Sequence, residues 1–215
     1  MRLEPGSIFS QVSYFDPRSD IENQARNLPH WRQSGRTYFV TFRLADALPA
    51  ARLQRLQVER EQFIAAHPQP WSPEARAEFH RRFTNRCQRW LDSGHGSCVL
   101  RDPSAGGIVA DALTHFDGSR YELHAWVVMP NHVHALVTPA SHTLDKILHS
   151  WKSFTALGIH RKLGLEGRLW QHEGYDHIVR SPEALRGIAR YIVNNPSKAR
   201  FETEYVFSRV PDSHE

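Results

Sequence analysis

The sequence has little that would place the protein in a membrane or in an oxidising compartment. No run of about 18 or more apolar residues occurs, so no segment is long enough to cross a bilayer as a helix. The chain does not open with the charged and apolar regions of a signal peptide, and its two cysteines, Cys87 and Cys98, form no metal or redox motif. We therefore expect a soluble protein of the reducing cytoplasm.

The sequence also lacks Gly-rich phosphate loops, internal repeats and low-complexity tracts. The missing phosphate loops argue against a doubly wound nucleotide-binding fold. Apolar residues make up 40% and charged residues 23% of the 215 residues, which is ordinary for a globular protein and sufficient for one sizeable core. We expect a single domain over residues 1–215.

The spacing of apolar residues predicts an alternation of strands and helices. Residues 1 to about 30 are polar and aperiodic, and their prolines indicate an N-terminal surface arm. Strands are expected at 36–44, 121–128 and 176–179, and helices at 50–66, 73–92, 103–115, 144–163 and 182–195. Pro196 should end the last helix at Asn195, because proline disfavours helical geometry in the residue before it. Consecutive strands that form a hairpin favour an α+β fold with an antiparallel or mixed sheet.

The most informative stretch is AWVVMPNHVHALV at 125–137, which reads as two strands joined by a tight turn at Pro130-Asn131. Side chains alternate along a strand, so His132 and His134 should project from one face while Val133 packs on the other. Two adjacent neutral imidazoles suit a divalent metal. Chance alone could give one such pattern among fourteen histidines. Unpaired polar groups in an apolar hairpin would, however, cost about 1–3 kcal/mol each without a metal or partner.

Nine basic residues of the C-terminal third are interleaved with aromatic residues, and the net charge of +4 favours an anionic partner. This composition is typical of a surface for single-stranded nucleic acid, because cations attract phosphates and rings stack on bases. Solvated helix faces around a packed aromatic core would give the same composition. These nine residues are Lys152, Arg161, Lys162, Arg168, Arg180, Arg186, Arg190, Lys198 and Arg200.

Two tyrosines are candidate nucleophiles. Tyr191 lies on the rim of the apolar stripe of the last expected helix, and Asn195 follows one turn later, where its amide could complete a metal shell. Tyr175 is a rival on chemical grounds, because it adjoins Asp176-His177. A tyrosine on a helix rim also often serves packing alone.

Four segments together carry a resemblance to a known family. They are AWVVMPNHVHALV at 125–137, HSWKSFTA at 149–156, LWQHEGYDHIVR at 169–180 and YIVNNPSKA at 191–199. In this order and spacing they resemble the REP-associated tyrosine transposases, a bacterial branch of the single-tyrosine HUH transposases. The resemblance covers residues 36–44 and about 102–200.

The resemblance implies a ferredoxin-like α+β fold, with an antiparallel sheet, helices packed on one face and a helical insertion at about 50–95. It implies cleavage and joining of single-stranded DNA at hairpin ends such as REP-like palindromes, through a 5′-phosphotyrosine and with Mg²⁺ or Mn²⁺. Such a protein would act as a monomer or homodimer in the bacterial cytoplasm, associated with the nucleoid when bound to DNA.

The same match implies roles for individual residues. The family's nucleophile falls on Tyr191 rather than Tyr175, and Asn195 becomes the third metal ligand beside His132 and His134. His177 and Lys152 fall where family members place active-site or DNA-facing groups, and His177 is our candidate base. The residues expected to face DNA are Lys152, Ser153, Arg180, Arg190 and Lys198.

Two other classes of protein fit the same residues. One is a non-catalytic nucleic-acid-binding or regulatory protein, in which the histidines pack or hold a structural ion. The other is a metallohydrolase that uses metal-bound water and leaves Tyr191 as scaffold. Of the three, only a transposase forms a covalent protein–DNA adduct.

Overall fold

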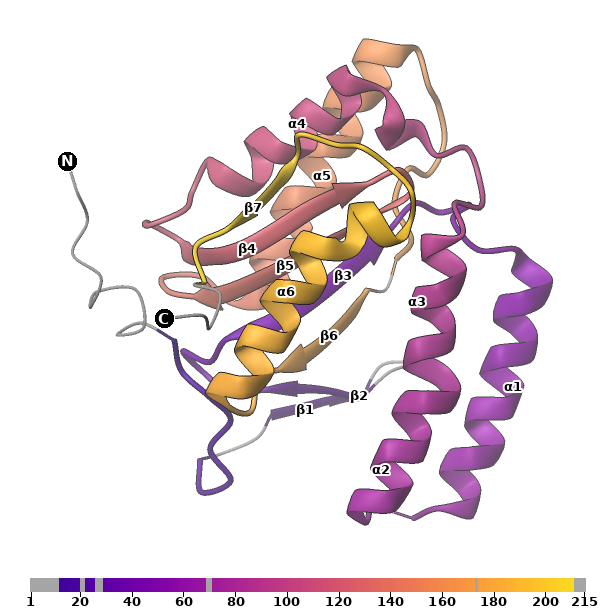
Figure 1. The fold of residues 1–215 in the computed structure, drawn as a ribbon, viewed down its shortest axis with the longest axis vertical. Coiled ribbons are helices and arrows are strands. Elements are labelled where there is room, and N and C mark those ends of the chain that lie inside the picture. The colour runs from indigo at the N-terminus through magenta and orange to yellow at the C-terminus, as the bar shows by residue number, and fades with distance from the viewer. Residues whose placement is uncertain (1–11, 20–21, 26–28, 69–70, 173, 211–215) are drawn as a thin grey trace.

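A five-stranded antiparallel sheet forms the centre of the molecule (Figure 1). The computed structural model describes residues 12–19, 22–25, 29–68, 71–172 and 174–210. The sheet has the strand order β6-β3-β5-β4-β7, with β3 (Tyr38–Arg43), β4 (Tyr121–Met129), β5 (His132–Pro139), β6 (Tyr175–Ile178) and β7 (Val206–Ser208). The helices are α1 (Ala50–Ala66), α2 (Pro73–Phe79), α3 (Asn85–Asp92), α4 (Pro103–Thr114), α5 (Leu144–Leu163) and α6 (Pro182–Lys198), with a short 3-10 turn at Val99–Arg101.

The order of β3, α4, β4, β5, α5 and β6 is the β-α-β-β-α-β arrangement of ferredoxin-like folds. The expected fold class is therefore confirmed, and the expected helices over 50–66 and 144–163 have the predicted bounds. Local signals in the sequence explain where helices start. Asp102 caps α4 by accepting from the backbone of Ser104 and Ala105, and Ser181 caps α6 by accepting from Ala184.

Helices cover both faces of the sheet, so the expectation that they pack on one face is wrong (Figure 1). α4 and α5 lie on the face whose core includes Val40 and Val133, whereas α6 lies on the face of Phe39 and Leu136. The physical reason is visible in β3 and β5, where both sets of alternating side chains are buried. A strand that is apolar on both sides needs a cover on both sides.

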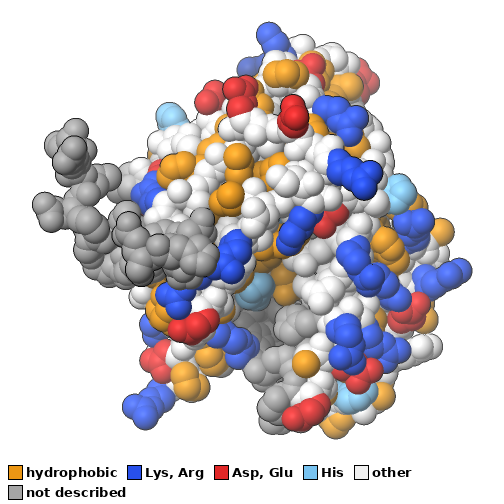
Figure 2. All heavy atoms as spheres, viewed as in Figure 1, with side chains coloured by type: hydrophobic (Ala, Val, Ile, Leu, Met, Phe, Trp, Pro, Cys, Tyr) orange, Lys and Arg blue, Asp and Glu red, His pale blue; other side chains and the backbone are white. Residues whose placement is uncertain are grey.

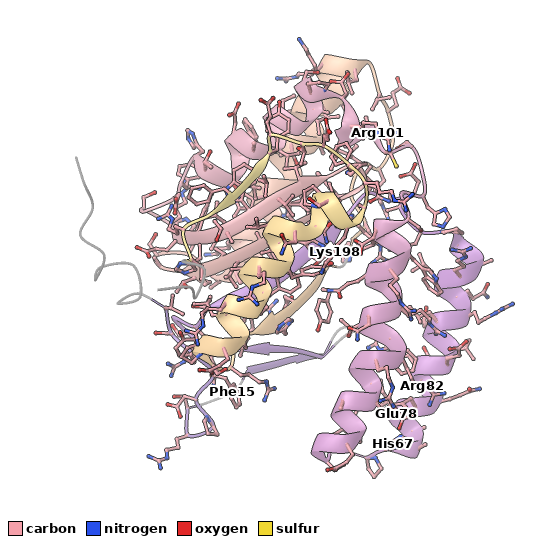
Figure 3. All side chains as sticks on the ribbon, in the orientation of Figure 1. Phe15, His67, Glu78, Arg82, Arg101 and Lys198 are labelled. Carbon is pink, nitrogen blue, oxygen red and sulfur yellow. The ribbon has the colours of Figure 1, made fainter. Side chains whose placement is uncertain are left out.

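α1, α2 and α3 form a helical hairpin, residues 50–92, that stands beside the sheet (Figure 1). The hairpin has a small core of its own, formed by Leu56, Phe63, Phe79 and Phe83. The helix expected over 73–92 is confirmed, although a π-helical turn at His80–Thr84 separates α2 from α3. Glu78 and Arg82 lie toward the far end of the hairpin (Figure 3), whereas the C-terminal end of α3 meets the sheet.

α6 continues through Pro196 to Lys198, so the expected end at Asn195 is wrong. Pro196 cannot donate the hydrogen bond that a helical residue gives to the carbonyl four positions earlier. Asn195 and Pro196 are nevertheless both buried against the sheet, and the backbone nitrogen of Phe201 donates to the Pro196 carbonyl at 2.9 Å. The burial of these two residues and the hydrogen bond from Phe201 stabilise the last turn by more than the missing Pro196 hydrogen bond destabilises it.

The N-terminal segment is more ordered than the expected surface arm. β1 (Glu22–Ala25) and β2 (Pro29–Arg32) pair as a two-stranded antiparallel sheet, and residues 1–11 lie outside the described part of the chain. The backbone nitrogen of Phe15 donates to the Val179 carbonyl at 2.9 Å, which fastens the segment to the body. These strands lack the apolar alternation that marked the other strands, and sequence periodicity therefore missed them.

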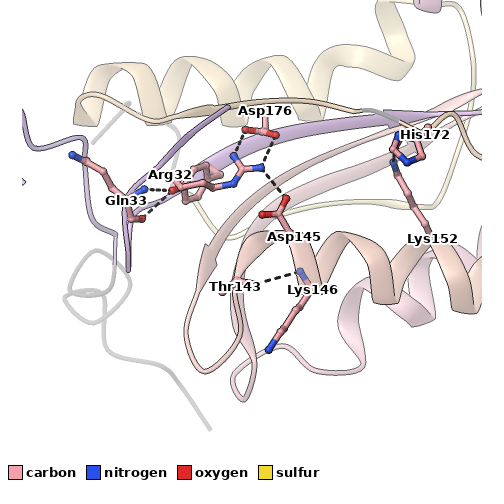
Figure 4. Close-up of polar contacts among 9 residues, drawn as sticks. Arg32, Gln33, Thr143, Asp145, Lys146, Lys152, His172 and Asp176 are labelled. Atoms are coloured by element: carbon pink, nitrogen blue, oxygen red, sulfur yellow. Dashed lines mark hydrogen bonds and ion pairs between the residues drawn. The ribbon is translucent and has the colours of Figure 1, made fainter. Parts of the chain in front are cut away.

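A buried ion-pair network fixes β2 to the edge of the main sheet (Figure 4). The Arg32 guanidinium donates to both carboxylate oxygens of Asp176 on β6, at 2.5 and 3.2 Å, and to Asp145 on α5 at 3.2 Å. The Asp176 side chain is only 3% exposed. Two parallel bonds to a carboxylate use the planar geometry of arginine, which lysine could not reproduce.

No helix within the described residues has the length and apolar character needed to span a membrane.

We expect Arg32→Met to lower the free energy of unfolding by about 3–5 kcal/mol, because it leaves the Asp176 carboxylate buried without its bidentate partner. Urea denaturation followed by circular dichroism measures this change. Asp145→Asn is the matched control, since Asp145 is more exposed and should contribute less than about 1 kcal/mol. An unchanged denaturation midpoint in Arg32→Met would show that the network is not a structural tie.

Candidate metal centre and active site

His132 and His134 project from one face of the central strand β5, as the sequence predicted. That face is covered by α6, and both side chains are fully buried. Their Nε2 atoms are 3.0 Å apart and point toward each other. Each outer nitrogen has a partner: His132 Nδ1 lies 2.8 Å from Asn131 Oδ1, and His134 Nδ1 lies 2.7 Å from Thr41 Oγ1. The contacts at Nδ1 therefore fix the orientation of both rings. The two Nε2 atoms face a common position between them, which we call the shared point.

Burial keeps these imidazoles neutral. It lowers the pKa of His132 to about 3, and burial together with the neighbouring His132 ring lowers the pKa of His134 well below its ordinary value. Neutral imidazole is the form that binds metals. The pair can therefore donate to a divalent ion at neutral pH without first losing protons.

Asp92, at the end of α3, is a third donor that the sequence did not single out. Its Oδ1 lies 3.9 Å from His132 Nε2, and one donor atom from each of Asp92, His132 and His134 lies within 4.8 Å of the others. Asp92 comes from the helical hairpin, for which the resemblance implied no role. Nothing in its local sequence marks it as a ligand, because only the fold brings it beside β5.

Asn195 completes the wall of the site from α6. Its side chain is fully buried, and within the described part of the chain neither amide atom has a hydrogen-bond partner of ordinary geometry. The same holds for the buried Oδ1 of Asp92. The amide still lies close enough to Asp92 to lower its pKa, which burial otherwise raises.

These unsatisfied atoms fit a metal ion. A buried polar atom without a partner costs about 1–3 kcal/mol, and a bound cation would satisfy the carboxylate and amide oxygens together. Two ligands at right angles and about 2.1 Å from an ion lie about 3 Å apart, which agrees with the two imidazoles. Nitrogen and oxygen donors of this kind suit Mg²⁺, Mn²⁺ or another first-row divalent ion.

Tyr191 lies in the same site. Its hydroxyl is 3.3 Å from His134 Nε2, and the Lys198 ammonium lies 5.4 Å from the centre of its ring. Burial and the nearby charge of Asp92 raise the pKa of the Tyr191 phenol, although the Asn195 amide lowers it. The phenol is thus protonated at neutral pH and would need help to become a nucleophile.

The rival nucleophile and the candidate base lie one strand away, on β6. Tyr175 pairs in register with Thr41, and burial raises its pKa to about 12, offset in part by a hydrogen bond with Thr84 of the helical hairpin. The His177 ring packs on Phe39 at a centroid distance of 5.3 Å, and Tyr191 contacts the same ring at 6.2 Å. His177 and Tyr191 therefore share one apolar neighbour on the α6 face.

Two of the predicted DNA-facing residues, Arg190 and Lys198, are exposed on α6, the helix that carries Tyr191. Arg190 lines a groove with Val206 and Phe207, whereas Lys198 lies close to the site. Lys198 lies at the end of α6 that faces α3 (Figure 3), and its charge lowers the pKa of Asp92. Lys and Arg side chains lie on both sides of a hollow between α6 and the helical hairpin (Figure 2).

The other three predicted contacts lie farther away. Arg180 is exposed just before α6 begins, with its guanidinium 4.9 Å from the Phe15 ring. Lys152 and Ser153 are on α5, on the opposite face of the sheet from Tyr191. The Lys152 ammonium donates to two backbone carbonyls, of Gln171 and His172, each at 3.1 Å. Figure 4 shows Lys152 beside His172. Lys152 therefore fastens the segment that leads into β6.

A comparison with known families identifies the part of the chain that carries this site. Residues 112–195 match the family described as "Transposase IS200 like", a segment that contains both histidines, Tyr191 and Asn195. The resemblance found in the sequence is thus confirmed, and residues 112–195 are similar to IS200-like transposases. No curated protein matches the chain.

Two solved structures have a related shape. One is a REP-associated tyrosine transposase bound to a REP hairpin, with 16% identity, a TM-score of 0.40 and coverage of 87% of this chain and 96% of that chain. The other is a candidate transposase from Deinococcus radiodurans R1, with 16% identity, a TM-score of 0.34 and coverage of 81% and 98%. At these low similarities, the identification of residues 112–195 depends on the family match.

We expect His132→Ala to weaken Mn²⁺ binding by more than about 100-fold and Asp92→Ala by at least about tenfold, because each removes a donor from the shared point. Loss of the free-Mn²⁺ signal in electron paramagnetic resonance titrations measures the affinity. Glu78→Ala is the matched control, because it removes a carboxylate from the far end of the same helical hairpin. Wild-type affinity in His132→Ala would contradict the metal centre.

Proposed function

We propose that this protein is a metal-dependent single-strand DNA endonuclease and strand transferase that forms a 5′-phosphotyrosine at hairpin-bearing DNA ends. The observation that carries the proposal is the contact between the Tyr191 hydroxyl and His134 Nε2, beside three further donors in one site. The family match over residues 112–195 supports a transposase. The proposal treats the whole chain as one domain that includes the helical hairpin.

His132, His134, Asp92 and Asn195 would hold the ion, for which Mg²⁺ and Mn²⁺ are the expected choices. A bound ion would supply Lewis-acid polarisation of the scissile phosphate. It would also partly neutralise the negative charge of the phosphate, which otherwise repels the attacking oxygen. The surrounding residues keep the donors rigid, because β5 is paired on both sides and α6 is packed on the sheet.

In the proposed reaction the Tyr191 oxygen attacks the phosphorus, so an O–P bond forms and the bond to the 3′-oxygen breaks. The downstream strand stays joined to Tyr191 through its 5′-phosphate, and the 3′-oxygen of the upstream strand takes up a proton to become a 3′-hydroxyl. The phenolic proton must go to a base, and His177 is our candidate. Reversal with another strand's 3′-hydroxyl joins DNA without an external energy source.

DNA would approach along the α6 side of the molecule. In this proposal Lys198, whose ammonium lies near the Tyr191 ring, would contact phosphates next to Tyr191, and the exposed Arg190 and Arg180 would contact the strand elsewhere along α6. Lys152 and Ser153 would reach only DNA that extends around the sheet edge. The similar solved transposase is bound to a REP hairpin, and we propose hairpin-bearing single strands as the substrate class here.

We expect Tyr191→Phe to bind metal and DNA normally but to form no covalent adduct with a hairpin-bearing single strand, because one oxygen is lost and the scaffold is kept. Tyr175→Phe is the matched control and should still form the adduct, since its hydroxyl contacts Thr84. Denaturing gel electrophoresis of the adduct, followed by peptide mapping, decides between the two tyrosines. An adduct in Tyr191→Phe, or one mapped to Tyr175, would overturn the assignment.

We expect affinity for single-stranded DNA to fall steeply with salt concentration, because several cations near α6 would displace counterions from phosphates. Lys198→Ala should weaken binding and reduce the slope of log affinity against log salt by roughly one. Lys146→Ala removes the same charge from an exposed position on α5, and it should change neither the affinity nor the salt slope. Equal slopes for wild type and Lys198→Ala, measured by fluorescence anisotropy, would remove Lys198 from the interface.

A further inference from the structure

The orientation of the buried Asn131 amide is determined by its neighbours. Its Nδ2 donates to the backbone carbonyl of His95 at 2.8 Å, and a carbonyl oxygen can only accept. The reverse orientation would place two acceptor oxygens in contact. Asn131 Oδ1 therefore faces His132 Nδ1, at 2.8 Å.

This orientation determines the tautomer of His132. An amide oxygen can only accept, so His132 Nδ1 must carry the hydrogen. A neutral imidazole has one N–H, which leaves His132 Nε2 as a bare acceptor aimed at the shared point. The carbonyl of His95 belongs to the segment that follows the helical hairpin, so that segment presets this ligand for metal binding.

His134 is held by a different kind of partner. Its Nδ1 lies 2.7 Å from the Thr41 hydroxyl, which can either donate or accept. Without an ion, the 3.0 Å contact with the bare Nε2 of His132 requires a hydrogen on His134 Nε2, and Thr41 then donates to Nδ1. With an ion, His134 Nε2 must be bare, and its Nδ1–H would donate to Thr41.

We propose that Asn131 and Thr41 are positioning residues with opposite tasks: Asn131 locks His132 in its metal-binding tautomer, and Thr41 lets His134 change tautomer when the ion binds. The ion-free pair is thereby satisfied by a hydrogen bond between the two rings. The hydrogen moves from Nε2 to Nδ1 of His134 on metal binding, so the net protonation is unchanged. This inference rests on the proposed metal-dependent function.

Long-range ¹H–¹⁵N spectra of ¹⁵N-histidine-labelled protein test the inference directly, because they report which ring nitrogen carries hydrogen. We expect His132 to be the Nδ1–H tautomer with and without Mg²⁺. We expect His134 to change from Nε2–H without the ion to Nδ1–H with it. An Nε2–H tautomer of His132 in either state would overturn the inference, as would an unchanged His134 tautomer with Mg²⁺ bound.

Variants of Thr41 separate positioning from folding. Thr41→Val keeps the shape and removes the hydroxyl, so Mn²⁺ affinity should fall by about 10–100-fold, whereas Thr41→Ser should keep it. Thr138→Val is the matched control, because Thr138 makes a similar 2.7 Å contact with buried His124 away from the site. Equal Mn²⁺ affinities for Thr41→Val and Thr41→Ser would overturn the role of Thr41.

Asn131→Ala tests the other half of the inference. It should allow both tautomers of His132 in the ion-free spectra, and a single Nδ1–H tautomer in this variant would overturn the role of Asn131. If Asn131→Ala does not fold, the wild-type spectra and the Thr41 variants still decide. A complete absence of Mg²⁺-dependent change in the wild type would contradict both the proposed function and the switch, whereas a bound ion without a tautomer change overturns the inference alone.

Discussion

The pairing of β5 on both sides determines the rest of the site. β5 is hydrogen-bonded to β3 and to β4, so its alternation cannot slip without exposing the core. Val133 and Ala135 fill the α4–α5 face, and His132 and His134 consequently face α6. A polar pair enclosed in this way has no water to satisfy it, and the surrounding groups must do so. Asn131 and Thr41 meet this requirement at the two Nδ1 atoms, and Asp92, Asn195 and Tyr191 lie around the two Nε2 atoms.

Enclosure also sets the chemistry that the site can perform. It depresses the basicity of both imidazoles, which favours their use as ligands rather than as proton acceptors. The same enclosure makes the Tyr191 phenol less acidic, which opposes its use as a nucleophile. Burial thus keeps His132 and His134 neutral for metal binding, but it also disfavours the ionised form of Tyr191 that would attack phosphorus. A cation at the shared point would reverse the penalty, because it favours a nearby negative oxygen.

Local periodicity was sufficient to predict the helices, the four strands of the ferredoxin-like core and the shared face of His132 and His134. It failed where long-range packing decides. α6 runs past Pro196 because burial outweighs a local preference, and β1, β2 and β7 are short strands without clear alternation. The placement of α6 on the second face depends on both sides of β3 and β5 being buried. Asp92 was missed because its role exists only once α3 stands beside β5.

The helical hairpin gives the proposed ion a mechanical consequence. Asp92, His132 and Asn195 are far apart in the chain, and both cysteines are free thiols. An ion shared by these ligands would act as a three-way cross-link that closes two long loops at once, from α3 to β5 and from β5 to α6. Such a cross-link would lower the conformational entropy of the unfolded chain, as a disulfide does. Unlike a disulfide, it would be lost whenever the metal is removed. The hairpin, whose small core is separate from the sheet, would then be tied most firmly to the sheet when the site is loaded.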